Sequence, residues 1–198
     1  MDDVYKTIKD VAEGLYKEKG SKFIAFAYPV RSEEEVKEII AARKEKYYDA
    51  RHHCYAYMLG ADKKRFRAND DGEPSSTAGK PILGQILSND LTDILIVVIR
   101  YFGGIKLGVS GLINAYREAA ADALKNAVII EKTVEREIHI RFSYLAMNDV
   151  MRIIKEEGAE ILSRNFEMEC EMLLSIREKA SDTLLARLSQ VDSVIFPS

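Results

Sequence analysis

Three short segments of this 198-residue chain hold most of the side chains that could do chemistry. They are RHHCYAY at 51–57, DDGEPSSTAGK at 70–80 and RYFGGIKLGVSG at 100–111. Their histidines, carboxylates, hydroxyls and glycines suit either an anion-binding site or a site for general acid–base chemistry. Each segment also has a purely structural explanation, because the same residue types form turns and helix caps.

The glycine-rich segment 100–111 predicts a phosphate-binding turn. Gly103 and Gly104 allow positive φ and close backbone approach, and a turn from a strand into a helix presents free N–H groups to an anion. Arg100 and Lys106 would add positive charge. The glycine spacing differs from the dinucleotide pattern G-x-G-x-x-G, so glycines that serve only close packing are the alternative.

The segment GEPSSTAGKP at 72–81 resembles a phosphate loop only in composition. Its first two glycines are separated by six residues, more than the pattern G-x-x-x-x-G-K-[ST] allows, and Pro81 stands where that pattern needs a hydroxyl. Ser76 and Thr77 ahead of a helix, with Lys80, could still bind an anion. The alternative is that these hydroxyls cap the helix and form turns.

An acid–base site can be drawn from His53 with Asp71 and Glu73. The spacing provides no nucleophile elbow and no residue that would orient the base. Solvated turn acids beside a half-buried histidine are therefore the alternative to a hydrolytic site.

A metal site is not expected around the paired histidines. On a strand, His52 and His53 point to opposite faces, so they cannot join Cys54 around one ion. No zinc framework, cofactor motif or C-x-x-C pair occurs, and Cys54 and Cys170 are predicted to be buried thiols. We expect no cofactor.

The overall charge argues against a protein that coats DNA, but local charge favours an anionic partner. The chain has 29 Lys and Arg against 32 Asp and Glu, with formal net charge −3. Residues 43–67 have eight basic and three acidic side chains, and four tyrosines, among them Tyr55, could stack on bases. An acidic protein partner for this basic segment is the alternative.

The sequence patterns of the helices and strands that must position these residues predict an α+β chain of two domains. The first domain, 1–133, carries net charge +1, and the second, 134–198, carries −4. Expected elements of the first are strands at 11–20, 21–30, 51–59, 63–68 and 94–99, and helices at 32–47, 81–87 and 110–127. The second has the βαββαβ order of a ferredoxin-like split unit, with strands at 134–143, 159–166, 169–176 and 191–196 and helices at 147–157 and 179–190.

The start of the chain and its apolar runs predict a cytoplasmic protein. MDDVYKTIKD lacks the basic and apolar regions of a signal peptide. The longest apolar run, Ile94 to Ile99, is too short to span a membrane. We therefore expect no membrane partner.

A longer signature resembles that of the YigZ/IMPACT family. Its matching positions are Gly79, Ile82, Leu83, Ile86, Leu91, Val97, Val98, Arg100 to Gly104, Leu107 and Gly108. RHHCYAY and RANDDGEPSSTAGKP also resemble that family's histidine-containing strand and acidic loop. The likeness extends over roughly 15–126.

The resemblance implies a first domain similar to domain 2 of ribosomal protein S5 and a second domain similar to ferredoxin-like domains of elongation factor G. Eukaryotic members regulate translation under amino-acid starvation and have an N-terminal RWD domain, which this sequence lacks, so it looks like the bacterial two-domain form. We expect a non-enzymatic regulator whose first domain binds RNA or a ribosomal surface, with a hydrolase or a protein-binding module as alternatives. The expected contact residues are His53, Tyr55, Ser76, Thr77, Lys80, Arg100, Gly103, Gly104 and Lys106.

Overall fold

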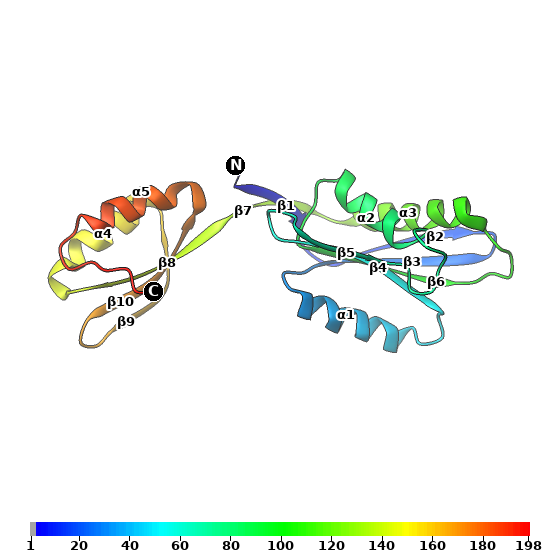
Figure 1. Cartoon of the computed structure of the whole chain (residues 1–198), viewed down its shortest axis with the longest axis horizontal. Helices are drawn as coiled ribbons and strands as arrows, with labels where there is room; N and C mark the ends of the chain where they lie inside the picture. The colour runs from blue at the N-terminus through cyan, green and yellow to red at the C-terminus, as the bar shows by residue number, and fades with distance from the viewer. Residues whose placement is uncertain (1–2) are drawn as a thin grey trace. The chain divides into compact units, whose positions relative to one another are not determined.

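The chain folds into two compact units, each a mixture of helices and strands (Figure 1). The computed structural model describes residues 3–198. One unit is Tyr5–Lys132, and the other is Thr133–Ser198 together with the residues just before Tyr5. The predicted α+β class is confirmed. No helix within 3–198 is long and apolar enough to cross a membrane.

The first unit is built on a five-stranded antiparallel sheet with the order β2-β3-β6-β4-β5. The strands are β2 (Ala12–Glu18), β3 (Ser21–Pro29), β4 (His52–Leu59), β5 (Arg65–Asn69) and β6 (Ile94–Tyr101). The apolar run of β6 is fully buried in the middle of the sheet. Such a run is expected of a strand that is covered on both faces.

Helices cover both faces of this sheet (Figure 1). α2 (Gly79–Ser88) and α3 (Gly108–Asn126) lie on one face, and α1 (Glu33–Lys46) lies on the other. Because successive side chains of a strand point to opposite faces, Ile96 and Val98 join the core under α2 and α3, whereas Val97 joins the core under α1.

Local sequence signals set the ends and the packing face of these helices. The Ser32 hydroxyl accepts a hydrogen bond from the Glu35 N–H at 3.2 Å, as the capping pattern predicts. The alanine-rich face of α3 allows close approach to β2. A Cβ added at Gly14 would lie 2.3 Å from the Ala123 backbone nitrogen.

The second unit is a three-stranded sheet with two helices packed against it. Its strands, in the order β8-β10-β9, are β8 (Glu135–Phe142), β9 (Glu160–Phe166) and β10 (Cys170–Arg177). Its helices are α4 (Met147–Glu157), which follows the 3-10 turn Tyr144–Ala146, and α5 (Glu178–Ser189). Val150 and Leu184 contribute to the common core of helices and sheet.

The prediction of a full strand at 191–196 is wrong. Only Ile195 pairs with β8, through two backbone hydrogen bonds to Arg141 at 2.9 and 3.0 Å. The backbone N–H groups of Val191 and Val194 instead make local turn bonds to the carbonyls of Leu188 and Val191, so they cannot extend a ladder. The position of Ile195 beside β8 still follows the strand order of a ferredoxin-like unit.

The sequence patterns did not predict two short strands. β1 (Val4–Ile8) pairs with β7 (Ile129–Thr133) in a separate two-stranded sheet. β7 is largely exposed and has no alternating apolar face, so its sequence holds no period-2 signal.

Candidate functional site

A cleft of about 580 Å³ opens where β4 begins and β6 ends. The two strands are antiparallel, and their register places His52 opposite Arg100. The lining residues are Asp49, Ala50, Arg51, His52, Arg100, Tyr101, Phe102 and Lys106. Sheet pairing thus unites two of the three chemically rich segments at one edge.

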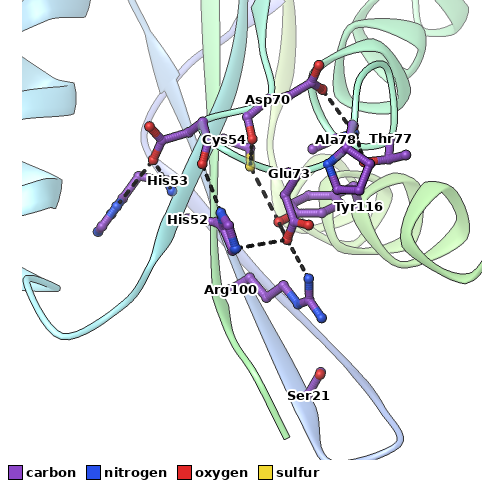
Figure 2. A network of polar contacts seen from close by, with 12 residues as sticks. Ser21, His52, His53, Cys54, Asp70, Glu73, Thr77, Ala78, Arg100 and Tyr116 are labelled. Atoms are coloured by element: carbon purple, nitrogen blue, oxygen red, sulfur yellow. Dashed lines mark hydrogen bonds and ion pairs between the residues drawn. The ribbon is translucent and has the colours of Figure 1, made fainter. Parts of the chain in front are cut away.

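The carboxylate of Glu73 lies beside this cleft and organises its buried polar groups (Figure 2). Its Oε1 accepts hydrogen bonds from Arg100 Nη1 at 2.5 Å and from the Tyr116 hydroxyl at 2.8 Å. The Glu73 side chain is 2% exposed and the Arg100 side chain 8%. Each buried charge is therefore compensated by the other.

Two aromatic rings and one carboxylate surround the guanidinium of Arg100. Its central carbon lies 5.7 Å from the ring centroids of both Phe23 and Phe102. Nη1 is occupied by Glu73. Nε is buried and has no hydrogen-bond partner among the described residues.

His52, rather than His53, is the histidine that faces Glu73. Its Nδ1–H donates to the Asp71 carbonyl at 2.8 Å, because a carbonyl can only accept. The neutral ring then carries its lone pair on Nε2, which lies 3.7 Å from Glu73 Oε1. The backbone of the 70–78 loop thus selects the tautomer that presents a lone pair beside the cleft.

His53 lies on the α1 side of the sheet, away from Glu73 (Figure 2). Its Nε2–H donates to the Tyr47 carbonyl at 2.8 Å, and its Nδ1 is 3.6 Å from Asp71 Oδ2. The structure therefore brings His53 to Asp71 but not to Glu73. Tyr55 packs against the core under α1 and does not line the cleft.

The loop before α2 is held together by Asp70. Its carboxylate accepts hydrogen bonds from the backbone N–H groups of Ser76 at 2.9 Å, Ala78 at 3.2 Å and Gly79 at 2.8 Å. The Thr77 hydroxyl donates to the Pro74 carbonyl at 2.6 Å. The start of α2, where an anion was predicted to bind, is therefore occupied by a carboxylate of the chain itself.

Replacing Asp70 by alanine is expected to lower the free energy of unfolding by about 1–2 kcal/mol, as loss of a helix cap does. Three backbone donors would lose their acceptor. Urea unfolding followed by circular dichroism measures the change, with Asp10→Ala at an exposed position as control. Equal stability of the two variants would show that Asp70 does not organise the loop.

The glycines of the 100–111 segment have different roles. A Cβ added at Gly103 would lie 2.0 Å from the Gly20 carbonyl carbon, and the Gly103 N–H donates to the Ser21 hydroxyl at 3.1 Å. Gly104 has a φ of +89° and open space around it. Both glycines were predicted as contact residues. Gly103 is required for close packing against the Gly20 backbone, and Gly104 allows the positive φ of the turn.

The thiol of Cys54 and the hydroxyls of Tyr116 and Tyr101 stay neutral at ordinary pH. Burial raises the pKa of the Cys54 thiol and of the Tyr116 hydroxyl, and Cys54 donates to Tyr116. Burial and a hydrogen bond to Asp49 raise the pKa of Tyr101 to about 12. Within residues 3–198, no group of three or more His, Cys, Asp or Glu side chains could hold a metal ion.

The cleft lies inside a region that matches known proteins. Residues 19–124 match the Impact N-terminal domain. The chain is 33% identical over 178 residues to the IMPACT family member YvyE of Bacillus subtilis, covering 90% of this chain and 82% of that protein. It is 32% identical over 151 residues to the IMPACT family member YigZ of Escherichia coli, covering 75% and 74%. A crystal structure of a hypothetical protein superposes with a TM-score of 0.77 at 26% identity, covering 100% of this chain and 98% of that one.

Proposed function

This chain belongs to the IMPACT family, and from that premise we propose that its first unit binds RNA phosphates in the cleft between β4 and β6 and acts in translation. The observation that carries the proposal is the lining of the cleft. Arg51, Arg100 and Lys106 provide positive charge. Asp49 is the single carboxylate among the lining residues, and it accepts a hydrogen bond from Tyr101.

Exposed aromatic side chains support single-stranded RNA as the partner. Phe102 lines the cleft and is 58% exposed, and Tyr48, next to the lining segment, is 83% exposed. Unpaired bases stack on such rings, whereas a duplex hides its base faces. A groove that joins cations with exposed rings is typical of a surface for single-stranded nucleic acid.

We expect the variant with Arg51→Gln and Lys106→Gln to bind single-stranded RNA more weakly and with a shallower salt dependence. Both side chains are exposed, so their loss should leave the fold intact. The slope of log affinity against log salt should fall by roughly 1.4, since each phosphate contact contributes about 0.7. Filter binding at several salt concentrations measures the slope.

The matched control is the variant with Lys9→Gln and Lys125→Gln, which removes the same charge from exposed positions. Lys125 lies in the last turn of α3, about 26 Å along the helix from its start beside the cleft. If the two double variants lose affinity equally, the RNA is held by net charge and not by the cleft.

The role in translation is tested by sedimentation of cell extracts through a sucrose gradient. We expect the protein to migrate with ribosomal particles, and brief RNase treatment separates binding to the particles from binding to messenger RNA between them. Protein that stays at the top of the gradient, with or without RNase, would contradict a translational role.

Hydrolysis in the same cleft is the second candidate function. The predicted acid–base set was His53, Asp71 and Glu73, and the observation that favours chemistry here is the fixed tautomer of His52 beside Glu73 and Arg100. Hydrolysis of RNA or of p-nitrophenyl phosphate that is abolished by His52→Gln and retained in His53→Gln would support an enzyme using His52. Retention in His52→Gln would exclude it.

A further inference from the structure

We propose that the cleft selects a terminal phosphate, a monoester, over the internal phosphodiesters of an RNA chain. The inference deepens the proposed RNA-binding function and rests on it. It starts from Arg100 Nε, which among the described residues that line the cleft is the buried donor without a hydrogen-bond partner.

The surroundings of Arg100 leave Nε of its guanidinium without a hydrogen-bond partner among the described residues. The ring centroids of Phe23 and Phe102 each lie 5.7 Å from its central carbon, and Glu73 occupies Nη1. An unpaired buried donor is unfavourable, and an oxyanion that reaches Nε would remove that cost. The planar group is held in place before the ligand arrives, which favours bidentate recognition of an oxyanion.

The charges around Arg100 suit a dianion. Glu73 balances Arg100, and the other charged lining residues are Arg51 and Lys106 against Asp49, which leaves an excess of one positive charge. A phosphate monoester carries about −1.5 to −2 charges at pH 7 and three acceptor oxygens. A phosphodiester carries a single charge and has only two free oxygens, so it would use fewer of these donors.

The recessed position of Arg100 also favours a phosphate at the end of an RNA chain over an internal phosphate. Arg100 is 8% exposed, whereas Phe102 and Lys106 at the rim are exposed. A terminal phosphate protrudes on a single ester bond and can enter such a recess. An internal phosphate would have to bring both flanking riboses past the rim.

The test compares one short single-stranded RNA in three forms, with a 5′-phosphate, with a 3′-phosphate and with hydroxyls at both ends. Fluorescence anisotropy at fixed salt gives the affinities. We expect one of the phosphorylated forms to bind about tenfold more tightly than the unphosphorylated form, as one added charge-assisted contact would produce. Equal affinity of all three forms would overturn the inference and leave RNA binding by the first unit intact.

Variants then assign the preference to the cleft. Arg100→Lys keeps the charge but loses the planar group, so the preference for the phosphorylated form should disappear. Lys106→Gln, at an exposed position that does not endanger the core, should reduce it, and Lys125→Gln should leave it unchanged. A preference that survives both Arg100→Lys and Lys106→Gln would place the terminal phosphate elsewhere.

Competition separates a free nucleotide from an RNA end. Uridine monophosphate and inorganic phosphate are added to the complex with phosphorylated RNA. Displacement by the nucleotide at the concentration at which unlabelled phosphorylated RNA competes would support a free nucleotide as the source of the monoester. If uridine monophosphate binds and no form of RNA does, the proposed RNA function fails while the selectivity for a monoester stands.

Discussion

Replacing Glu73 by alanine is expected to lower the free energy of unfolding by about 3–5 kcal/mol, the range for removing one partner of a buried ion pair. The Glu73 carboxylate accepts hydrogen bonds from Arg100 and Tyr116, and its side chain is 2% exposed. Its loss leaves the buried guanidinium without a counter-charge and the tyrosine hydroxyl without an acceptor. Equilibrium urea unfolding of the full chain measures the change.

Two further variants test the cause of this loss. Glu34→Ala, in the exposed first turn of α1, is the control and should change stability little. Adding Arg100→Leu to Glu73→Ala should recover part of the lost stability, because the uncompensated charge is removed together with its partner. A Glu73→Ala variant as stable as Glu34→Ala would show that the ion pair does not hold the site together.

Gly103→Ala is expected to lower the free energy of unfolding by about 2–3 kcal/mol and to weaken RNA binding as well. The added Cβ would lie 2.0 Å from the Gly20 carbonyl carbon and 2.3 Å from the Ser21 nitrogen. Both obstacles are backbone atoms, so the end of β6 or the turn at Gly20 must shift, and a shift of β6 would displace Arg100 and Phe102. Urea unfolding and filter binding measure the two effects.

Gly84→Ala is the matched control. A Cβ at this position in α2 meets nothing within 4 Å, and its φ is not in the left-handed region. We therefore expect a gain in stability of about 0.4–1 kcal/mol, because alanine restricts the unfolded chain and favours the helix. If Gly103→Ala behaves like Gly84→Ala, close backbone packing is not why Gly103 is a glycine.

Elements with strong local patterns followed from the sequence. The run Ile94 to Ile99 predicts a strand covered on both faces, and the alanine stripe of α3 predicts close packing on a sheet; both are confirmed. The pattern was misleading at 191–196, where apolar residues make turn bonds and only Ile195 pairs with a strand. Apolar residues near a chain end can enter a core without forming a ladder.

The site followed from the sequence in part. Arg100 and Lys106 were predicted from their place in a glycine-rich turn, and both line the cleft. His53 was predicted as the site histidine and His52 was not, because alternation separates the two faces without saying which face holds the site. Register decides this, since it sets His52 opposite Arg100.

The loop at 70–80 shows why composition alone misleads. Its hydroxyls and glycines suggest an anion cradle, and the anion present is the side chain of Asp70. No pattern in the loop distinguishes a carboxylate that caps α2 from one that faces solvent. That distinction depends on how the loop folds back onto the helix start.

By itself the sequence determined the α+β class, the apolar faces, the family resemblance and the charged turn after β6, because these depend on residues a few positions apart. Only the tertiary structure decided which side chains meet. Glu73 and Arg100 are separated by 27 residues, Glu73 and Tyr116 by 43, and Ser21 and Gly103 by 82. Such contacts depend on strand order and register, which local periodicity leaves undetermined.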